Sequence, residues 1–169
     1  GKKLIEDLKK KGCQCDFIFL NQGMTRINVK IKGQEETEIN GEGPEITPTA
    51  LRSLMMRLEH LKEGDILVLS GSIPGTLPED MYERVILRQQ GKKVKIVVDA
   101  TKNLLKDTLK YHPFLVKPNH HELGELFGVE ISNREEAIFY AEKLQQMGAE
   151  NVLVSMAGEG AVLLDACGE

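Results

Sequence analysis

The feature that most constrains the fold of this chain is an alternation of short apolar segments with amphipathic segments in its second part. The segments DILVLS, VKIVVD and NVLVS, at 65–70, 94–99 and 151–155, are rich in branched side chains, which is typical of buried strands. Between them, apolar residues recur at helical spacing. Apolar strands separated by amphipathic helices predict an α/β fold, with a doubly wound, mostly parallel sheet and helices on both faces.

Start signals divide this pattern into elements. Thr47 and Pro48 supply a cap and a first helical residue. Ser132, with Glu135 three residues later, forms a predicted capping box. Helices are predicted at 2–11, 47–61, 77–91, 104–111, 120–128 and 132–148, and further strands at 114–117 and 160–165.

The sequence between the helices predicted at 2–11 and 47–61 has a different pattern. Its β-type stretches are DFIFL, TRINVKI and TEIN, at 16–20, 25–31 and 37–40. With Gly33 at a turn, they predict a small meander of strands. One face of the meander carries Arg26, Asn28 and Lys30, so it is turned either to solvent or to a ligand.

Composition and charge exclude several classes of protein. The 169 residues carry a formal net charge of −4, which gives no long-range attraction to nucleic acid. The longest apolar run is too short to span a bilayer, so no membrane partner is expected. The three cysteines complete neither a disulfide framework nor a zinc site, which favours a reducing cytoplasm.

Ligands of open parallel sheets bind beyond the carboxyl ends of the strands, so the loops that follow strands are the candidate sites. Four such loops stand out, SGSIPG, DATKN, KPNHHE and SMAGEG, at 70–75, 99–103, 117–122 and 155–160. In SGSIPG, backbone N–H groups directly before a helix could hold a phosphate or a sugar hydroxyl, and a tight turn without a ligand is the alternative. Asp99 ends its strand either as an acid facing a ligand or as a helix cap.

The KPNHHE loop is the most specific of the four. Lys117 ends a strand, Asn119 is placed to cap the next helix, and Glu122 lies one turn along on the same side. An amide and a carboxylate side by side could order waters around a divalent cation bound to phosphates, or they form only a cap and its reciprocal partner. The adjacent His120 and His121 point in different directions and are not expected to chelate one metal ion.

Two further groups have both a functional and a structural interpretation. In SMAGEG, Ser155 offers a hydroxyl, and Gly158 and Gly160 would let the backbone approach a nucleotide phosphate; a plain hairpin is the alternative. Arg26 could pair bidentately with a substrate phosphate, although an isolated arginine on a strand is more often solvated.

The order of these motifs resembles that of a known enzyme family. TRINVKI, an SGS-P loop, an aspartate-terminated strand, KPN-x-x-E and S-x-x-G-x-G follow one another as in the ribokinase-like sugar kinases, over essentially the whole chain. Within that family, TRINVKI, EINGEGP and KPNHHELGE are most similar to the bacterial 1-phosphofructokinases, with tagatose-6-phosphate kinases next. The resemblance implies ATP-dependent phosphorylation of a ketohexose phosphate, with fructose 1-phosphate giving fructose 1,6-bisphosphate.

The resemblance also assigns parts and residues. It implies a helix of the α/β domain at 1–15, a β lid at 16–43, and an α/β core with part of the nucleotide site at 44–169. It places Arg26 and Ser72 at the substrate, Asp99 at the site of phosphate transfer, and Lys117, Asn119, Glu122, Ser155, Gly158 and Gly160 at ATP, with Asn119 and Glu122 holding Mg²⁺ through water.

Two motifs of the family are not found in the chain. These are an N-terminal region that grips the sugar and a late Gly-Ala-Gly-Asp motif that supplies the catalytic base. We therefore expect the chain to be truncated at both ends, the base to lie beyond Glu169, and the chain alone to be inactive. The alternatives are a tagatose-6-phosphate kinase and a noncatalytic module that binds a nucleotide or sugar phosphate. The resemblance further suggests a homodimer formed through the lid.

Overall fold

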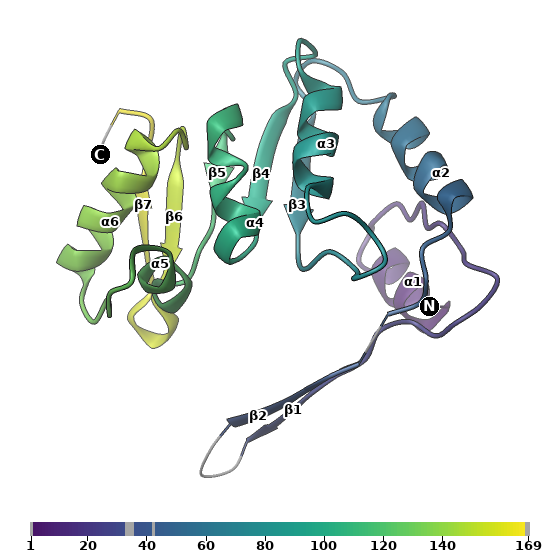
Figure 1. Ribbon diagram of the computed structural model, residues 1–169, viewed down its shortest axis with the longest axis horizontal. Coiled ribbons are helices and arrows are strands. Elements are labelled where there is room, and N and C mark those ends of the chain that lie inside the picture. The colour runs from purple at the N-terminus through teal and green to yellow at the C-terminus, as the bar shows by residue number, and fades with distance from the viewer. Residues whose placement is uncertain (1, 33–35, 42, 168–169) are drawn as a thin grey trace. The chain divides into compact units, whose positions relative to one another are not determined.

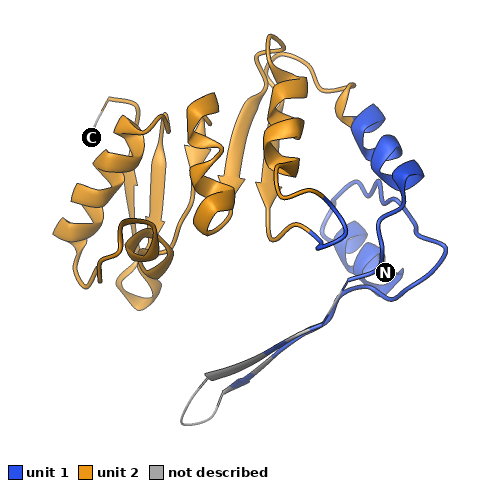
Figure 2. Ribbon diagram, viewed as in Figure 1, with its two compact units in different colours: residues 1–57, 74–77 blue, residues 58–73, 78–169 orange. Residues whose placement is uncertain are grey.

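The computed structural model describes residues 2–32, 36–41 and 43–167, so the turn predicted at Gly33 lies outside the described residues. The chain divides into two compact units (Figure 2). Unit 1 comprises Gly1–Arg57 and Pro74–Leu77, and unit 2 comprises Leu58–Ile73 and Pro78–Glu169.

The first helix of unit 1, α1 (Lys2–Lys10), ends close to a glycine, as the sequence predicts. Gly12 has a φ of +80°, a left-handed conformation that a residue without Cβ adopts readily. Its N–H donates to the Lys9 carbonyl, and the Cys13 N–H reaches back to the Leu8 carbonyl, each at 3.0 Å. This pair of bonds is a Schellman motif, which satisfies carbonyl groups that a helix end leaves unpaired.

The β-type stretches of unit 1 form a two-stranded hairpin (Figure 1) instead of a three-stranded meander. β1 (Asn28–Lys32) pairs with β2 (Glu36–Asn40) in antiparallel fashion, with Val29 opposite Ile39. The strand predicted at 16–20 is wrong, because this segment pairs with no strand in the described part of the chain. A strand forms only where a neighbour bonds its N–H and C=O groups, so local apolar character does not suffice.

Helix α2 (Pro48–Leu58) starts where its cap predicts. The Thr47 hydroxyl accepts a hydrogen bond from the Ala50 N–H at 3.2 Å, and Pro48 takes the first helical position, where no N–H is required. The helix ends at Leu58, before the predicted Leu61. The start signal is therefore more specific than the end of the apolar pattern.

Unit 2 contains a five-stranded sheet in the order β3–β4–β5–β6–β7 (Figure 1). The strands are β3 (Ile66–Ser70), β4 (Lys95–Asp99), β5 (Leu115–Val116), β6 (Val152–Ser155) and β7 (Ala161–Leu164). The first four are parallel, and β7 runs antiparallel to β6. The mostly parallel α/β fold predicted from the sequence is confirmed.

The helices of unit 2 differ from the predicted ones in their bounds. They are α3 (Met81–Gln89), α4 (Lys102–Lys106), α5 (His120–Phe127) and α6 (Arg134–Gln146), with the 3₁₀ turns η1 (Leu109–Tyr111) and η2 (Ala157–Glu159). The cap of α6 is Asn133, whose Oδ1 accepts the Glu136 N–H at 2.9 Å. The capping box predicted at Ser132 and Glu135 is therefore wrong by one residue. Serine and asparagine cap equally well, so residue type alone does not distinguish the two positions.

The core of unit 2 lies on one face of the sheet. It is built from buried residues that alternate along the strands, namely Leu69, Ile96, Val98, Val116, Val152, Val154, Val162 and Leu164. On the other face, Ile66, Val68 and Leu163 are 59%, 57% and 57% exposed. Because the strands follow one another in chain order, right-handed crossovers place their connecting helices on the same face. The sequence predicts helices on both faces of the sheet, so this arrangement differs from the prediction. A doubly wound sheet reverses its strand order at one point, and the described strands of unit 2 contain no such reversal.

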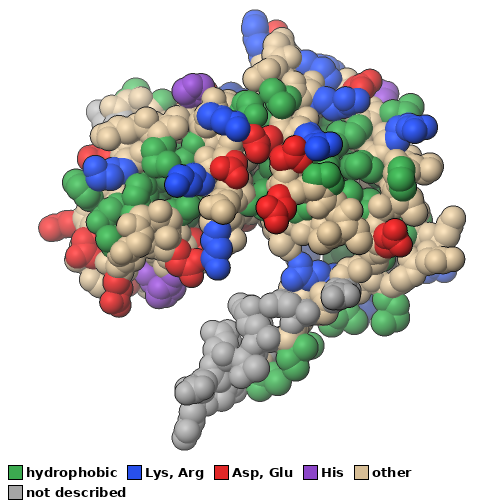
Figure 3. All heavy atoms as spheres, viewed as in Figure 1, with side chains coloured by type: hydrophobic (Ala, Val, Ile, Leu, Met, Phe, Trp, Pro, Cys, Tyr) green, Lys and Arg blue, Asp and Glu red, His purple; other side chains and the backbone are tan. Residues whose placement is uncertain are grey.

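The surface of the molecule is mixed in character. Acidic, basic and apolar side chains are interspersed on the face shown in Figure 3. The ion pair of Lys93 with Glu63, at 3.0 Å, joins side chains that are 74% and 69% exposed, so it contributes little to stability. No helix within the described ranges combines the length and the apolar character that crossing a membrane requires.

Candidate functional site

The strand ends of unit 2 meet at one edge of the sheet, where the predicted loops begin. β3 ends at Ser70 and β4 at Asp99, and these two residues lie opposite each other in the parallel register. Farther along, Asn119 forms a parallel bridge with Ser155, the last residue of β6. The structure thus brings together the loops after β3, β4, β5 and β6, as expected for a parallel sheet.

Asp99 is paired with Lys117 across the ends of β4 and β5. Lys117 Nζ lies 3.2 Å from Asp99 Oδ1, and the Ser70 hydroxyl donates to Asp99 Oδ2 at 3.4 Å. Lys117 and Asp99 are 39% and 37% exposed, so solvent reaches the pair. The cap position of α4 is Thr101, which excludes the helix-cap interpretation of Asp99. Sequence reasoning missed Ser70, because its contact with Asp99 depends on the strand register.

Two backbone groups of Gly71 hold the SGSIPG loop in place by hydrogen bonds. The Gly71 N–H donates to the Asp99 carbonyl at 3.1 Å, and the Gly71 carbonyl accepts the Tyr82 hydroxyl at 2.9 Å. Burial, and then the Asp99 carboxylate, raise the pKa of Tyr82. The Tyr82 hydroxyl therefore stays protonated and can donate its hydrogen bond. Ser72 follows as an exposed residue. The prediction that a helix follows directly is wrong, because the intervening prolines form turns and α3 begins only at Met81.

Asn119 and Glu122 form the capping box of α5. Asn119 Oδ1 accepts the Glu122 N–H, and Glu122 Oε2 accepts the Asn119 N–H, both at 2.8 Å. The structural interpretation of these two residues is confirmed. The Lys117 N–H donates to the Val98 carbonyl at 2.9 Å, which fixes the loop beside the end of β4. An ammonium, an amide and a carboxylate thus lie within one short segment at the edge of the sheet.

The SMAGEG loop is the turn of the β6–β7 hairpin, so the plain-hairpin description of its backbone is correct. The Met156 N–H donates to the Gly160 carbonyl at 2.8 Å, and Gly160 has a φ of +91°. A Cβ placed on Gly158 or Gly160 would meet nothing within 4 Å, so the loop is open at both positions. The Ser155 N–H donates to the Pro118 carbonyl at 3.1 Å, which joins this loop to KPNHHE.

The two histidines of KPNHHE lie differently from the prediction. Their ring centroids are 3.9 Å apart, so the prediction that His120 and His121 point in different directions is wrong. Side-chain rotamers, which helical spacing does not determine, bring the rings together. His120 Nδ1 lies 3.4 Å from the Ser155 carbonyl oxygen, at the edge of the site. Within the described ranges, no group of three or more His, Cys, Asp or Glu side chains is placed to hold a metal ion.

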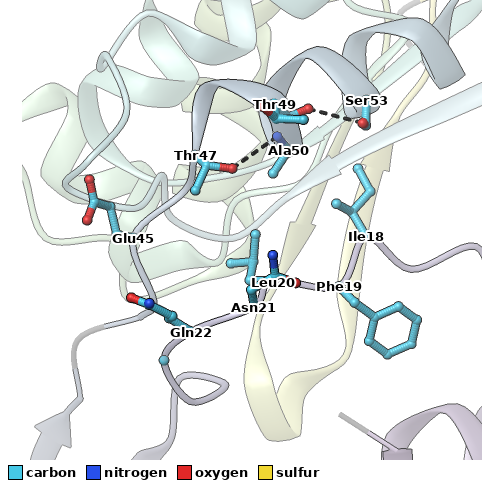
Figure 4. A pocket seen from close by; sticks show the side chains of 11 residues that line it. Ile18, Phe19, Leu20, Asn21, Gln22, Glu45, Thr47, Thr49, Ala50 and Ser53 are labelled. Atoms are coloured by element: carbon cyan, nitrogen blue, oxygen red, sulfur yellow. Dashed lines mark hydrogen bonds between the residues drawn. The ribbon is translucent and has the colours of Figure 1, made fainter.

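Arg26 belongs to unit 1, where its Nε donates to Asn28 Oδ1 at 3.0 Å from an exposed position. Unit 1 also contains a cavity of about 720 Å³, between the segment at 18–23 and the start of α2 (Figure 4). Threonine and serine side chains of α2 contribute polar groups to its wall. The residues predicted to bind a ligand are not among those that line it.

The sequence matches a protein-family model described as pfkB family carbohydrate kinase, over residues 1–169. It is 49% identical to a 1-phosphofructokinase of Bacillus subtilis over 142 residues, which are 84% of this chain and 47% of the relative. It is 34% identical to a D-tagatose-1-phosphate kinase of Bacillus licheniformis over 166 residues, which are 98% of this chain and 54% of the relative. The chain spans about half the length of the curated relatives it matches.

A solved structure has the same fold. The chain is similar to phosphofructokinase-2 from Escherichia coli in complex with fructose-6-phosphate, with a TM-score of 0.82. The match covers 98% of this chain and 56% of that chain, at 24% sequence identity. This likeness concerns the arrangement of helices and strands alone.

Proposed function

The chain belongs to the pfkB family of carbohydrate kinases, and on that basis we propose that the protein containing it transfers the γ-phosphoryl group of ATP to a ketohexose phosphate. The proposed substrate is fructose 1-phosphate, which would give fructose 1,6-bisphosphate. The observation that carries this proposal is the 49% identity with a relative named 1-phosphofructokinase. Phosphoryl transfer depends chiefly on positioning and charge stabilisation, and the loops at the edge of the sheet offer groups for both.

Lys117 and the start of α5 are the proposed site of the nucleotide phosphates. The lysine ammonium is a compact charge that suits a phosphate, and the positive end of the α5 dipole adds to it. The capping box engages Oε2 of Glu122, so a water bound to Mg²⁺ would contact Oε1. Asn119 and Glu122 would hold the ion through water in this way, since magnesium keeps several of its waters. When bound, the ion neutralises charge on the phosphate oxygens.

The hairpin loop after β6 is the proposed contact for the rest of the nucleotide. The open space beside Gly158 and Gly160 would let the backbone approach the ligand closely. The Ser155 hydroxyl and the N–H groups of the loop would serve as donors. A side chain at either glycine would occupy part of this space.

Ser72 and Arg26 are the proposed contacts of the sugar phosphate, with residues 16–43 as a lid over it. Ser72 is exposed on the loop after β3, where its hydroxyl can meet a sugar hydroxyl. The planar guanidinium of Arg26 could bind a phosphate group through two parallel hydrogen bonds. An arginine in this role favours a phosphorylated sugar over an unphosphorylated one.

The lid hairpin supports the further proposal that two copies of the protein associate. Val29, Ile31 and Ile39 lie on β1 and β2 with 46%, 50% and 57% of their surface exposed. An isolated two-stranded hairpin with an apolar face is at best marginally stable in water. Pairing with the hairpin of a second copy would cover these side chains and form a homodimer through the lid.

The test is an assay of the purified protein containing this chain, supplied with ATP, Mg²⁺ and fructose 1-phosphate. We expect ADP and fructose 1,6-bisphosphate to form in equal amounts, with a rate that saturates as fructose 1-phosphate increases. ATP binding without turnover would instead favour a noncatalytic module. Absence of ATP binding in a calorimetric titration would contradict the proposal.

A tagatose phosphate is the second candidate substrate. The observation that favours it is the 34% identity with a D-tagatose-1-phosphate kinase over 98% of this chain. Tagatose 1-phosphate and fructose 1-phosphate differ in configuration at one hydroxyl, so the ratio of their kcat/KM values measures how well the site distinguishes them. A higher kcat/KM for the tagatose phosphate than for fructose 1-phosphate would reverse the assignment.

A further inference from the structure

Asp99 bonds to both neighbouring strand ends. Its carbonyl accepts the Gly71 N–H at 3.1 Å, and its Oδ2 accepts the Ser70 hydroxyl at 3.4 Å, both from the β3 side. On the β5 side, its Oδ1 lies 3.2 Å from Lys117 Nζ. Both carboxylate oxygens thus contact protein groups, one on each neighbouring strand end.

Lys117 is fixed at its backbone but has a long, flexible side chain. Its N–H donates to the Val98 carbonyl at 2.9 Å, and the next residue, Pro118, is buried. The ammonium nevertheless sits on four rotatable bonds, and ordering such a side chain when a ligand binds weakens the binding. In the structure this ammonium lies beside the Asp99 carboxylate at the edge of the sheet.

We propose that Asp99 is a positioning residue that holds Lys117 ready for an anionic phosphate, and that it acts through Lys117 without touching the nucleotide. This inference rests on the proposed function, in which Lys117 binds the phosphates of ATP. Charge supports it, because an unpaired carboxylate at this place would repel a phosphate. Paired with Lys117, the carboxylate is neutralised, and its remaining effect is to orient the ammonium.

A double-mutant cycle tests the inference, with Asp99→Ala, Lys117→Met and the double variant titrated with ATP and Mg²⁺. Asp99→Ala is expected to weaken binding about fivefold, because Lys117 must then be ordered on binding. In the Lys117→Met background the same change should have no further effect. Asp99→Asn keeps an oxygen toward the ammonium and should restore most of the affinity. Losses that multiply in the double variant, or tighter binding by Asp99→Ala, would overturn the inference.

A ligand-free measurement separates this inference from the proposed function. Nuclear magnetic resonance relaxation of the Lys117 side chain should show restricted motion in the wild type and free motion in Asp99→Ala. Lys95, whose Nζ lies 4.4 Å from the centroid of the Phe114 ring at the opposite ends of the strands, is the control and should not change. If the wild type does not bind ATP, the proposed function fails, and this measurement still decides the positioning role. Free motion of Lys117 in the wild type would overturn that role.

Discussion

Asn119 and Glu122 bond to each other reciprocally at the first turn of α5, each through its side chain and its backbone, at 2.8 Å in both directions. The same two residues are the proposed water-mediated ligands of magnesium. The cap uses Oε2 of Glu122, and the proposed contact with a magnesium-bound water uses Oε1. A folding role and a proposed binding role thus fall on the same two side chains, and mutation can separate them.

Asn119→Ala and Asn133→Ala form a matched pair that separates the two roles. Each removes the cap of one helix, of α5 or of α6, so each should lower the free energy of unfolding by about 1 kcal/mol. Only Asn119→Ala should also weaken the binding of ATP with Mg²⁺. Urea unfolding and calorimetric titration measure the two effects. Equal ATP affinity in both variants would contradict the proposed magnesium site.

Tyr82→Phe tests whether the hydrogen bond from Tyr82 to Gly71 positions the SGSIPG loop. The change removes the hydroxyl that donates to the Gly71 carbonyl, so the loop carrying Ser72 loses one hydrogen bond. We expect the affinity for the sugar phosphate to fall about fivefold, in line with one net hydrogen bond, with ATP affinity unchanged. Tyr140→Phe is the control, because the ring of Tyr140 packs against Phe127, away from this loop. A similar loss in both variants would point to general destabilisation.

Glu83 should make the stability of unit 2 depend on acidic pH. Its carboxylate accepts hydrogen bonds from Lys110 at 2.6 Å and from the Tyr111 hydroxyl at 2.9 Å. The bond from Lys110, and then the bond from Tyr111, lower the pKa of Glu83 below its ordinary value of 4.5, although partial burial opposes them. The folded state therefore binds the proton less readily, so this stabilisation is present above pH 4.5 and is lost as the pH falls through the lowered pKa.

Glu83→Gln should accordingly be less stable than the wild type at neutral pH and should lose less stability in acid. Urea midpoints measured from neutral pH to about pH 3 test this dependence. Some acid sensitivity should persist, because the backbone N–H of Ser132 lowers the pKa of Glu136 as well. Glu142→Gln, an exposed position on α6, is the control. Parallel curves for Glu83→Gln and the wild type would contradict the prediction.

Gly148→Ala should be strongly destabilising. Gly148 has a φ of +129°, and a Cβ there would collide with the carbonyl oxygen of Leu109. The expected loss is about 3 kcal/mol, because backbone must move to make room. Gly128→Ala is the control, since its φ of +69° is also left-handed but a Cβ would meet nothing within 4 Å, and it should cost about 1 kcal/mol. Thermal and urea unfolding would measure the stability of both variants. Equal losses of stability would contradict the predicted steric clash at Gly148.

Ile39→Lys tests the proposed homodimer through the lid. The charge would lie on the apolar face of the hairpin, so we expect light scattering to report a dimer for the wild type and a monomer for the variant at the same concentration. Leu163→Lys is a control of equal exposure, as both residues are 57% exposed. If Leu163→Lys separates the dimer and Ile39→Lys does not, the open face of the sheet is the interface and the lid is not.

The elements that the sequence predicted well are those whose signals are local. β3, β4 and β6 match the predicted strands almost residue for residue, because each is a short run of branched residues bounded by polar ones. The cap of α5 was predicted because asparagine followed by glutamate three residues later is a complete signal within one turn. The order of motifs along the chain then led to the family.

The features that the sequence could not provide depend on contacts between distant segments. The segment at 16–20 has a strand-like composition, but composition does not supply a pairing partner. Ser70 and Tyr82 join the site only because the register of β3 with β4 and the start of α3 place them there. The pairing of Lys117 with Asp99 likewise follows from strand order and not from spacing along the chain.

The sequential strand order has a consequence for how unit 2 forms. β4, β5, β6 and β7 each pair with the strand immediately before them in the chain, so each of these pairings closes the shortest loop available to it. Each parallel pairing must wait for its crossover helix, which makes it slower to form than a hairpin, but the sequential order lets the sheet grow strand by strand as the polypeptide leaves the ribosome. β7 then joins β6 by a hairpin, the most local pairing among the strands of unit 2.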